Sequence, residues 1–402
     1  MQSQKGHQDR RLKVLFLTPW YPTLENPVHG IFVQEHAKAV QLKDDVVVFH
    51  SQRCAGLPQR WHVELESDRS LTAGLPTYRI LHKQAALPNF SLFSELVATL
   101  AGLRRLRRQG FHPDILHAHT YTAGAVAVLL GKWLGVPTVV TEQSSEFPRK
   151  LVRGAGIWKA RLAFGQAAMA MPVSMALQHA IEAYGIRAKF QVVPNVVDTS
   201  MFHPAPHPPG SPKQVLTVAM LDPSHNKGIP LLLQALAGLH ACRNDWLLDI
   251  VGDGPARSEY EQLAKTLGLT DKVRFRGATP KPEVARWMQQ ADLFVLASRY
   301  ETFSAVTAEA LASGLPVLIT QCGGPEEYVS SAVGMTVPVG DVNALQAALA
   351  TMLDALVSYV PDRVAEYAAS HFSPETVGQT LHAIYLEAKQ SYGKHIAGRP
   401  QS

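Results

Sequence analysis

Two glutamates in the second half of the chain have the spacing and surroundings to hold a phosphorylated sugar. Glu301 lies in a short polar stretch, and Glu309 lies in the run of good helix formers that follows it, residues 306–312. Gly314 and the proline after the next residue end that run where a C-cap glycine is expected. A loop that leads into a helix offers free N–H groups and the positive end of the helix dipole, which suits a phosphate. Glu301 could then reach a sugar hydroxyl and Glu309 a ribose diol, although solvated helix faces also carry glutamates at this spacing.

Lys227 stands at a second position suited to phosphate chemistry. It follows a predicted strand at residues 215–219 and precedes a helix with apolar periodicity, residues 229–239. An ammonium group there could neutralise the charge that accumulates on a departing diphosphate. The alternative is a lysine that is simply exposed at a helix start.

Two histidines end a predicted strand at residues 114–120. His117 and His119 alternate, so their side chains point to the same face of the sheet. His119 comes at the carboxyl end of the strand, where α/β sheets place ligand contacts. A histidine pair can also indicate a metal, but no third ligand occurs at a helical or strand spacing. We therefore predict a ligand contact and no metal site.

The composition is that of a globular protein that contains two domains. The chain has 402 residues, 46% of them hydrophobic and 18% charged. No window approaches the about 20 apolar residues that span a bilayer, and the polar residues 1–10 predict no signal peptide. The three cysteines are scattered, which indicates a reducing compartment. A net charge of +5 favours anionic partners, and we expect a cytoplasmic protein that does not bind nucleic acid.

Strands and helices alternate along the chain, which predicts parallel sheets with helices on both faces. A proline-rich connector at residues 203–212 separates two such series. We expect a first domain over residues 1–200, with a linker to about 212, and a second over 201–372. Residues 373–402 form a final segment, in which Ser373 caps a helix that ends near residue 389. Residues 52–88 show no hydrophobic pattern from which helices or strands could be assigned.

Several motifs resemble those of the family 4 retaining glycosyltransferases. Glu301-x7-Glu309, with Phe303, Gly314 and Pro316 around it, resembles the donor-site signature of that family. Residues 192–202 are similar to its crossing between domains. The resemblance implies an α/β protein of the GT-B fold: two facing Rossmann-like domains with a cleft between them, and a C-terminal helix that crosses back to the first domain. The second domain would hold the sugar nucleotide, and the first would present the acceptor.

The resemblance also implies roles for particular residues. His119, Glu301 and Lys227 would be catalytic, and backbone groups around 276–278 would read the base. The donor-binding residues would be Gly30, Lys227, Arg276, Gly277, Arg299, Glu301, Thr302, Phe303, Ser304 and Glu309. Contact with the acceptor is expected from Glu142, Gln143 and Ser144.

The chain departs from the family pattern at three positions. Met220 stands where the family typically has an arginine, Gln143 where it often has a histidine, and His29 before Gly30 where a second glycine is usual. Either His225 or Arg299 takes over part of the second phosphate contact, or the donor binds more weakly.

The implied function is transfer of a sugar, with retention, from a nucleoside-diphosphate sugar to a glycan or lipid-linked acceptor in bacterial polysaccharide or envelope synthesis. No Asp-x-Asp pair occurs in a suitable loop, so we expect no metal cofactor. No carboxylate can be singled out as a nucleophile, which favours displacement on the same face of the sugar, with the leaving phosphate helping to deprotonate the acceptor. The alternatives are a sugar-nucleotide epimerase and a non-catalytic subunit, both with the GT-B fold.

Two basic segments bear on the location of the protein. Four arginines surround Leu106 at residues 104–108, and residues 149–161 contain further basic and aromatic side chains. They could bind anionic lipid at the inner face of the cytoplasmic membrane. The first group could instead complement the dipole of its own helix.

Overall fold

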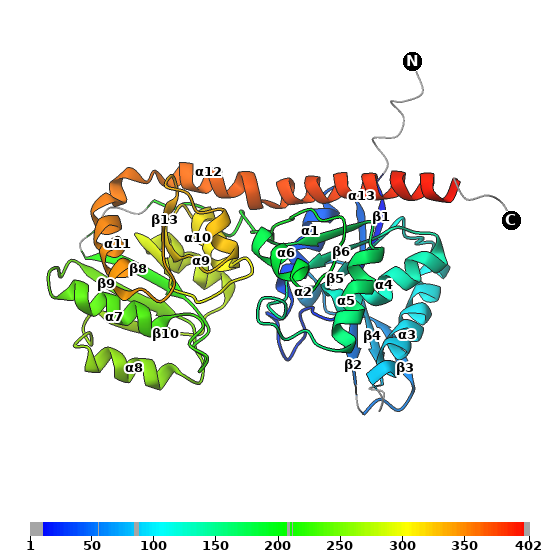
Figure 1. Ribbon diagram of the computed structural model, residues 1–402, viewed down its shortest axis with the longest axis horizontal. Coiled ribbons are helices and arrows are strands. Elements are labelled where there is room, and N and C mark those ends of the chain that lie inside the picture. Colours follow the sequence, from blue (N-terminus) through cyan, green and yellow to red (C-terminus); the bar gives the residue numbers. More distant parts are fainter. Residues whose placement is uncertain (1–10, 55, 84–87, 207–209, 211, 398–402) are drawn as a thin grey trace, which may run out of the picture. The chain divides into compact units, whose positions relative to one another are not determined.

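The computed structural model describes residues 11–54, 56–83, 88–206, 210 and 212–397. It divides into two compact units (Figure 1). Unit 1 runs to Val196 and takes up the chain again at Pro374, and unit 2 is Val197–Ser373. The sequence placed the boundary at residue 200 and treated the last segment separately. Residues 1–10, on which the expectation about a signal peptide rests, lie outside the described residues, as do 207–209 and 211 of the connector.

Unit 1 is built on a seven-stranded sheet in the order β3-β4-β2-β1-β5-β6-β7. All neighbouring strands are parallel except β3, which pairs antiparallel with β4. The strands are β1 Lys13–Thr18, β2 Asp45–Arg53, β3 Trp61–Leu65, β4 Thr77–His82, β5 Ile115–His119, β6 Thr138–Glu142 and β7 Met169–Pro172. Ligands of such sheets bind beyond the carboxyl ends of the strands, where the order of strands reverses. In unit 1 that point lies between β1 and β5.

Helices cover both faces of this sheet. They are α1 Ile31–Gln41, α2 Arg69–Thr72, α3 Pro88–Arg108, α4 Thr120–Leu134, α5 Ala155–Gln166, α6 Met175–Glu182 and α13 Pro374–Ala397. Phe16 of β1 shares a core with Val33 of α1 and with Leu381 and Tyr385 of α13. The C-terminal helix is therefore an integral part of unit 1, and it continues past residue 389, where we expected it to end.

The stretch from 52 to 88, which the sequence pattern left unassigned, contains β3, α2 and β4. β3 is an exposed edge strand, and β4 is buried although it contains Arg79. The guanidinium of Arg79 donates to Glu66 Oε2 at 2.9 Å and to the Pro22 carbonyl at 2.8 Å. A buried strand that holds a paired arginine lacks the apolar run by which parallel strands are recognised.

Unit 2 has an all-parallel sheet of six strands in the order β10-β9-β8-β11-β12-β13. The strands are β8 Lys213–Val218, β9 Trp246–Val251, β10 Val273–Gly277, β11 Leu293–Leu296, β12 Val317–Thr320 and β13 Gly334–Val337. Counted within the unit, this is the 3-2-1-4-5-6 order of a dinucleotide-binding fold. The order reverses between β8 and β11, so the ligand edge lies where these two strands end. Two parallel α/β units confirm the predicted fold class.

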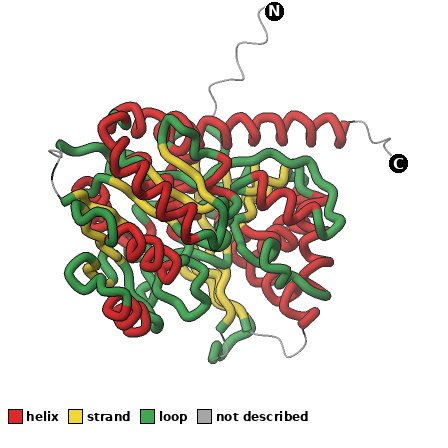
Figure 2. The backbone as a smooth tube through the Cα atoms, turned by 60° about the vertical axis from the view of Figure 1, so that its left-hand side comes forward, coloured by secondary structure: helices red, strands yellow, loops and turns green. Residues whose placement is uncertain are grey.

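The helices of unit 2 lie around the strands, which run through the interior (Figure 2). The α-helices are α7 Ile229–His240, α8 Arg257–Thr266, α9 Lys281–Gln290, α10 Ala305–Ala312, α11 Val342–Ala355 and α12 Pro361–Phe372. Short 3-10 turns, Gly324–Glu327 and Leu356–Ser358, complete the unit. One core joins Leu233 of α7, Tyr260 of α8 and Leu349 of α11 to Val215 and Ile250 of the sheet.

Gly228 allows the loop after β8 to approach β11 closely. Its φ is 65°, and a Cβ atom there would lie 1.9 Å from the carbonyl oxygen of Ala297. Gly228→Ala is therefore expected to lower the free energy of unfolding by more than the about 1 kcal/mol that a left-handed alanine costs. Gly268→Ala is the matched control, because Gly268 has a φ of 72° and no atom within 4 Å of the added Cβ. Equal losses for both variants, measured by urea unfolding, would contradict the close approach.

No single described helix is long and apolar enough to cross a membrane; one pair, Val342–Ser358 and Pro361–Gly393, meets the criteria only when taken together, and it is bent by 101°.

Candidate active site

An ion pair occupies the ligand edge of unit 2. Lys227 closes the loop after β8, Glu301 follows β11, and Lys227 Nζ lies 2.7 Å from Glu301 Oε1. Ser298 Oγ donates to the same oxygen at 2.8 Å. The side chains are 29% and 12% exposed, so the pair is accessible mainly through the lysine. Both contacts use Oε1, which leaves Oε2 for a donor such as a sugar hydroxyl.

Backbone hydrogen bonds hold the two loops of this pair together. The Arg299 N–H donates to the Asn226 carbonyl at 2.7 Å, and Asn226 Nδ2 donates to the Tyr300 carbonyl at 3.2 Å. On the other side, the Glu301 N–H donates to Cys322 at 2.7 Å and its carbonyl accepts from the Gly324 N–H at 3.0 Å. The Gly324 N–H is therefore already used within the protein.

The segment before α10 is held in an unusual conformation. Ser304 has a φ of 64°, and its side chain does not cap α10. Tyr328 Oη donates to the carbonyls of Phe303 and Ser304 at 2.7 and 3.0 Å, and the buried ring of Phe303 packs on Tyr328 and Phe372. Phe303 thus shapes the loop from within the core. Since no side chain caps α10, its first N–H groups remain suitable for an anion.

Glu309 has a partner that the sequence analysis missed. Its carboxylate, 8% exposed, lies 3.0 Å from Lys281 Nζ at the start of α9. Lys281 also lies over the ring of Phe202. A lysine at the first position of a helix opposes the helix dipole. This unfavourable position was the one signal in the sequence that could have identified Lys281 as the partner of a carboxylate.

The predicted base-reading strand presents its arginines to a carboxylate. Arg274 Nη2 and Arg276 Nε each lie 2.6 Å from an oxygen of the buried Asp249. The guanidinium of Arg276 also lies 4.7 Å from the centre of the Trp287 ring. The Arg276 side chain is thus held by contacts within unit 2. The backbone near Gly277, which has a φ of 78°, is left to read the base of the donor, as we expected of residues 276–278.

The position where the family typically has an arginine carries an exposed methionine. Met220 is 68% exposed. Of the two proposed replacements, His225 is engaged: Nδ1 lies 3.1 Å from Tyr260 Oη, and Nε2 lies 3.6 Å from Glu259. Burial raises the pKa of Tyr260, and Arg299, which is exposed, lies close enough for its charge to oppose that rise. Arg299 is therefore the better placed of the two to move onto an anion.

His119 lies in a buried cluster of rings at the ligand edge of unit 1. Its ring stacks on His117 with centroids 4.5 Å apart and lies 5.4 Å from the ring of His36. Burial holds the pKa of His119 well below its ordinary value, helped by the charges of His117 and His36, so the imidazole is neutral. The next residue, Thr120, has a φ of 73°, which is rare for a β-branched residue and marks strain beside the ring.

Gln143 and Tyr385 fix the rings of the two strand histidines. Gln143 Nε2 lies 2.9 Å from His119 Nδ1. With the amide nitrogen donating, Nδ1 accepts, and the proton of the neutral imidazole is on Nε2. His119 Nε2 is buried and has no partner among the described residues. His117 lies between Tyr385 Oη of α13 and Thr141 Oγ1, each at 2.7 Å. The amide that stands where the family often has a histidine therefore orients His119.

Glu142 has a structural role in unit 1, and its contact with the acceptor stays a prediction. Its carboxylate is fully buried and accepts from the N–H groups of Tyr121, Gln143 and Ser144 at 2.8 to 3.0 Å. It therefore caps the start of α4 and holds the loop after β6. Ser144 is buried as well, and its Oγ accepts from the Glu146 N–H.

Glu142 is expected to make the stability of the fold depend on pH. Burial raises its pKa from 4.5 to about 7, outweighing the three N–H groups, which lower it. The folded state then binds the proton more tightly than the unfolded chain, so this contribution is greatest below pH 4.5 and is lost as pH rises to 7. Relative to Glu142→Gln, the wild type should lose about 2 kcal/mol of unfolding free energy between pH 5 and 8. A difference between the two that does not change with pH would mean that the N–H groups keep the carboxylate charged.

Gly30 has a conformational role at the start of α1. It has a φ of 69° and begins α1, and a Cβ atom there would lie 2.3 Å from the backbone of Trp20. Gly30 is buried, so in this structure it closes the loop after β1.

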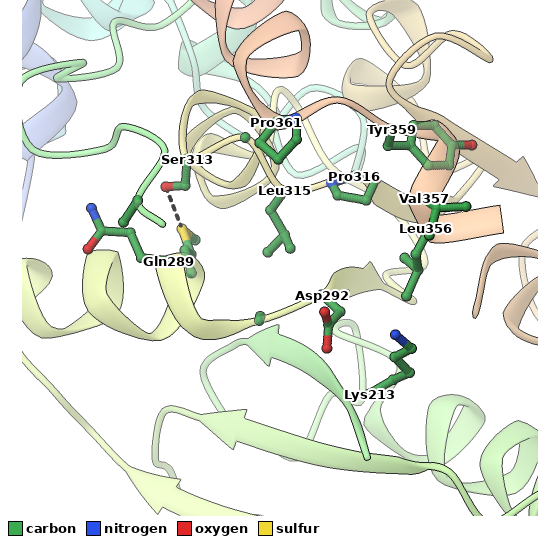
Figure 3. A pocket seen from close by; sticks show the side chains of 14 residues that line it. Lys213, Gln289, Asp292, Ser313, Leu315, Pro316, Leu356, Val357, Tyr359 and Pro361 are labelled. Carbon is green, nitrogen blue, oxygen red and sulfur yellow. Dashed lines mark hydrogen bonds between the residues drawn. The ribbon is translucent and has the colours of Figure 1, made fainter. Parts of the chain in front are cut away.

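A cavity of about 280 Å³ in unit 2 lies away from these residues (Figure 3). Lys213 begins β8, and Asp292 and Pro316 come just before β11 and β12, so this cavity is at the amino edge of the sheet. The described residues contain no group of three or more His, Cys, Asp or Glu side chains that could hold a metal.

Two family models match consecutive parts of the chain. "Glycosyltransferase Family 4" matches residues 30–201, and "Glycosyl transferases group 1" matches residues 198–370. Glycogen synthase of Mycobacterium tuberculosis is 27% identical over 310 residues, covering 72% of this chain and 73% of the relative. D-inositol 3-phosphate glycosyltransferase of Thermobispora bispora is 28% identical over 402 residues, covering 89% of each.

Solved structures show the same fold. HepE of Anabaena in complex with UDP has a TM-score of 0.70 at 20% identity and covers 92% of this chain and 99% of its own. Sucrose-phosphate synthase of Thermosynechococcus elongatus has a TM-score of 0.68 at 20% identity, covering 97% of this chain and all of its own.

Proposed function

The chain belongs to glycosyltransferase family 4, with the GT-B fold and activity that depends on a nucleotide sugar, and we propose that it transfers the sugar with retention of anomeric configuration. The proposed acceptor is a glycan or a lipid-linked sugar in bacterial polysaccharide or envelope synthesis. The observation that carries the proposal is the Lys227–Glu301 pair, placed where the strand order of unit 2 reverses.

In this proposal unit 2 holds the donor. Lys227 moves onto the diphosphate, the first N–H groups of α10 receive a phosphate oxygen, and Glu301 Oε2 accepts from a sugar hydroxyl. Glu309 accepts from the ribose diol while Lys281 holds its carboxylate in place. Because Met220 carries no charge, Arg299 supplies the second phosphate contact.

The proposed reaction is a displacement on one face of the sugar. The bond between C1 and the phosphate oxygen breaks, and its electron pair stays with the diphosphate. The acceptor oxygen forms its bond to C1 on the same face, and its proton passes to the departing phosphate. Lys227 and Arg299 offset the charge that develops there, so this mechanism needs no divalent ion. His119 donates from Nε2 to a hydroxyl of the donor sugar.

Unit 1 is assigned to the acceptor and to contact with an anionic membrane. Arg105 is committed to the Val63 carbonyl, but Trp158 is 56% exposed, and Arg153, Lys159 and Arg161 lie near it in the sequence. Phe93, in the first half of α3, is 63% exposed. Cosedimentation with vesicles that contain phosphatidylglycerol tests this location. Trp158→Ala should reduce the bound fraction, whereas no binding even at low salt would exclude the membrane contact.

Incubation with a panel of UDP, ADP and GDP sugars tests the function as a whole. We expect one donor to be hydrolysed slowly without acceptor and rapidly with a glycan acceptor, with the anomeric configuration retained in the product by NMR. Epimerised nucleotide sugar in place of released nucleotide would support the epimerase. Binding of a nucleotide sugar without turnover on any acceptor would support a non-catalytic subunit.

A further inference from the structure

A cavity of about 330 Å³ in unit 2 is lined by α9 and by the neighbouring strands β8, β9 and β10. Its polar side chains are Gln214 of β8, Asp249 of β9, Arg274 and Arg276 of β10, and Trp287 and Gln290 of α9. Sites for small molecules have volumes of about 300–1,000 Å³, so this cavity is large enough to hold one.

This cavity is separate from the edge where the donor is proposed to bind. The helix α9 begins at Lys281, just after the carboxyl end of β10, and Trp287 and Gln290 follow by six and nine residues. Since a helix rises about 1.5 Å per residue, the two side chains begin about 9 and 14 Å further along α9. Gln214 is the second residue of β8. The cavity therefore extends along one face of the sheet towards the amino ends of the strands.

The face of the sheet inside this cavity is charged. Strand residues alternate between two faces, and Val273 belongs to the core of the unit while Phe275 packs against it. Arg274 and Arg276 therefore point to the opposite face, where Asp249, 5% exposed, pairs in register with Arg274. Parallel sheets covered by helices are normally apolar on both faces, and buried ion pairs add little to stability. Packing alone does not explain these charges.

The cavity offers hydrogen-bond donors that the described part of the protein does not use. Asp249 accepts from one nitrogen of each arginine, Arg274 Nη2 and Arg276 Nε, each at 2.6 Å. Arg274 Nε and Trp287 Nε1 are buried, and neither has a hydrogen-bond partner among the described residues. Buried donors are nearly always paired, so two unpaired ones in side chains that line a cavity indicate a missing acceptor.

These groups favour an anion as the ligand. Two arginines and one aspartate are the charged residues of the lining, which leaves one formal positive charge in excess. Guanidinium groups bind phosphate through paired N–H bonds, and a phosphate ester has three strong acceptor oxygens. Gln290 is exposed, so its amide is accessible to a hydroxyl of the same ligand.

We propose that this cavity is a second ligand site of unit 2 and that it binds the phosphate group of a small phosphorylated metabolite, such as a sugar phosphate. Arg274 and Arg276 pair with the phosphate, and Trp287 Nε1 donates to one of its oxygens. Asp249 holds both guanidinium groups in place, and Gln290 donates to a hydroxyl of the organic part. Binding here does not require the donor, so it can be measured without nucleotide.

Titration calorimetry of the full chain tests this site, with glucose 6-phosphate, glycerol 3-phosphate and glucose as probes. At least one phosphate ester is expected to bind at least tenfold more tightly than glucose. Arg276→Gln should abolish that preference, and Trp287→Phe, which keeps a ring but removes the indole N–H, should weaken the ester at least threefold. Arg286→Gln is the matched control, because Arg286 is exposed on the same helix and pairs with Glu283. It should leave binding unchanged.

Lys227→Met distinguishes this cavity from the donor edge, since both could attract a phosphate. The ester should bind Lys227→Met as tightly as the wild type, and loss of binding in that variant would place the phosphate at the donor edge and overturn the proposal. A preference that survives Arg276→Gln, or the absence of binding by both esters, would also overturn it. Melting temperatures show whether each variant is folded. If Arg276→Gln is not folded, an unchanged affinity in Trp287→Phe would be the contradicting result.

Discussion

Replacing Lys227 with methionine is expected to lower kcat by about 10²–10³-fold, because methionine keeps the length of the side chain but cannot offset charge on the leaving diphosphate. The measurement is the initial rate of nucleoside-diphosphate release at saturating donor. Lys265→Met is the matched control, since Lys265 is an exposed lysine in the last turn of α8.

Lys227→Met also leaves the Glu301 carboxylate, which is 12% exposed, without its cation. Its urea unfolding should therefore be measured beside its activity, and the loss of rate should persist where the variant is fully folded. A kcat within threefold of wild type in a folded variant would remove Lys227 from the mechanism.

Glu301→Gln is expected to lower kcat/KM by about 10- to 100-fold, the range for losing a hydrogen bond to a charged group. Glutamine has the same shape and can still accept from Ser298 Oγ, which lies 2.8 Å from Oε1 in the wild type. What it loses is the charge that orients Lys227 and attracts a sugar hydroxyl. Glu261→Gln is the control, because Glu261 pairs with Arg257 in the same unit on the exposed surface of α8.

The two substitutions should not be additive. Lys227 and Glu301 contact each other, and residues in contact show coupling in a double-mutant cycle. The double variant is expected to lose less activity than the product of the single losses. Full additivity would mean that the pair does not act together during turnover.

The sequence predicted those elements whose composition matches their burial. Val317–Thr320 has three apolar residues before its final threonine, and it forms the buried strand β12. β4 is just as buried, but Arg79 within it is satisfied by Glu66 and by a distant loop, so its pattern does not resemble that of a buried strand. Where a charged residue is buried only because a distant group pairs with it, the local sequence does not show the apolar pattern of a buried strand.

The same distinction applies to the site. Lys227 and Glu301 were each identified from the local sequence, but their ion pair depends on β8 lying beside β11, which only the strand order establishes. Lys281 pairs with Glu309 across two helices and was missed. The expected acceptor contact of Glu142 came from the family resemblance and stays a prediction, whereas the cap that its fully buried carboxylate forms on α4 depends on a residue 21 positions earlier in the chain.

Calorimetric titration of UDP, ADP and GDP into the wild type and Lys227→Met tests most directly whether the edge between β8 and β11 holds the donor diphosphate. We predict that at least one nucleotide binds the wild type and that Lys227→Met weakens it at least tenfold, while Lys265→Met does not. Equal affinity of the wild type and Lys227→Met for the same nucleotide would contradict the assignment of this edge as the donor site.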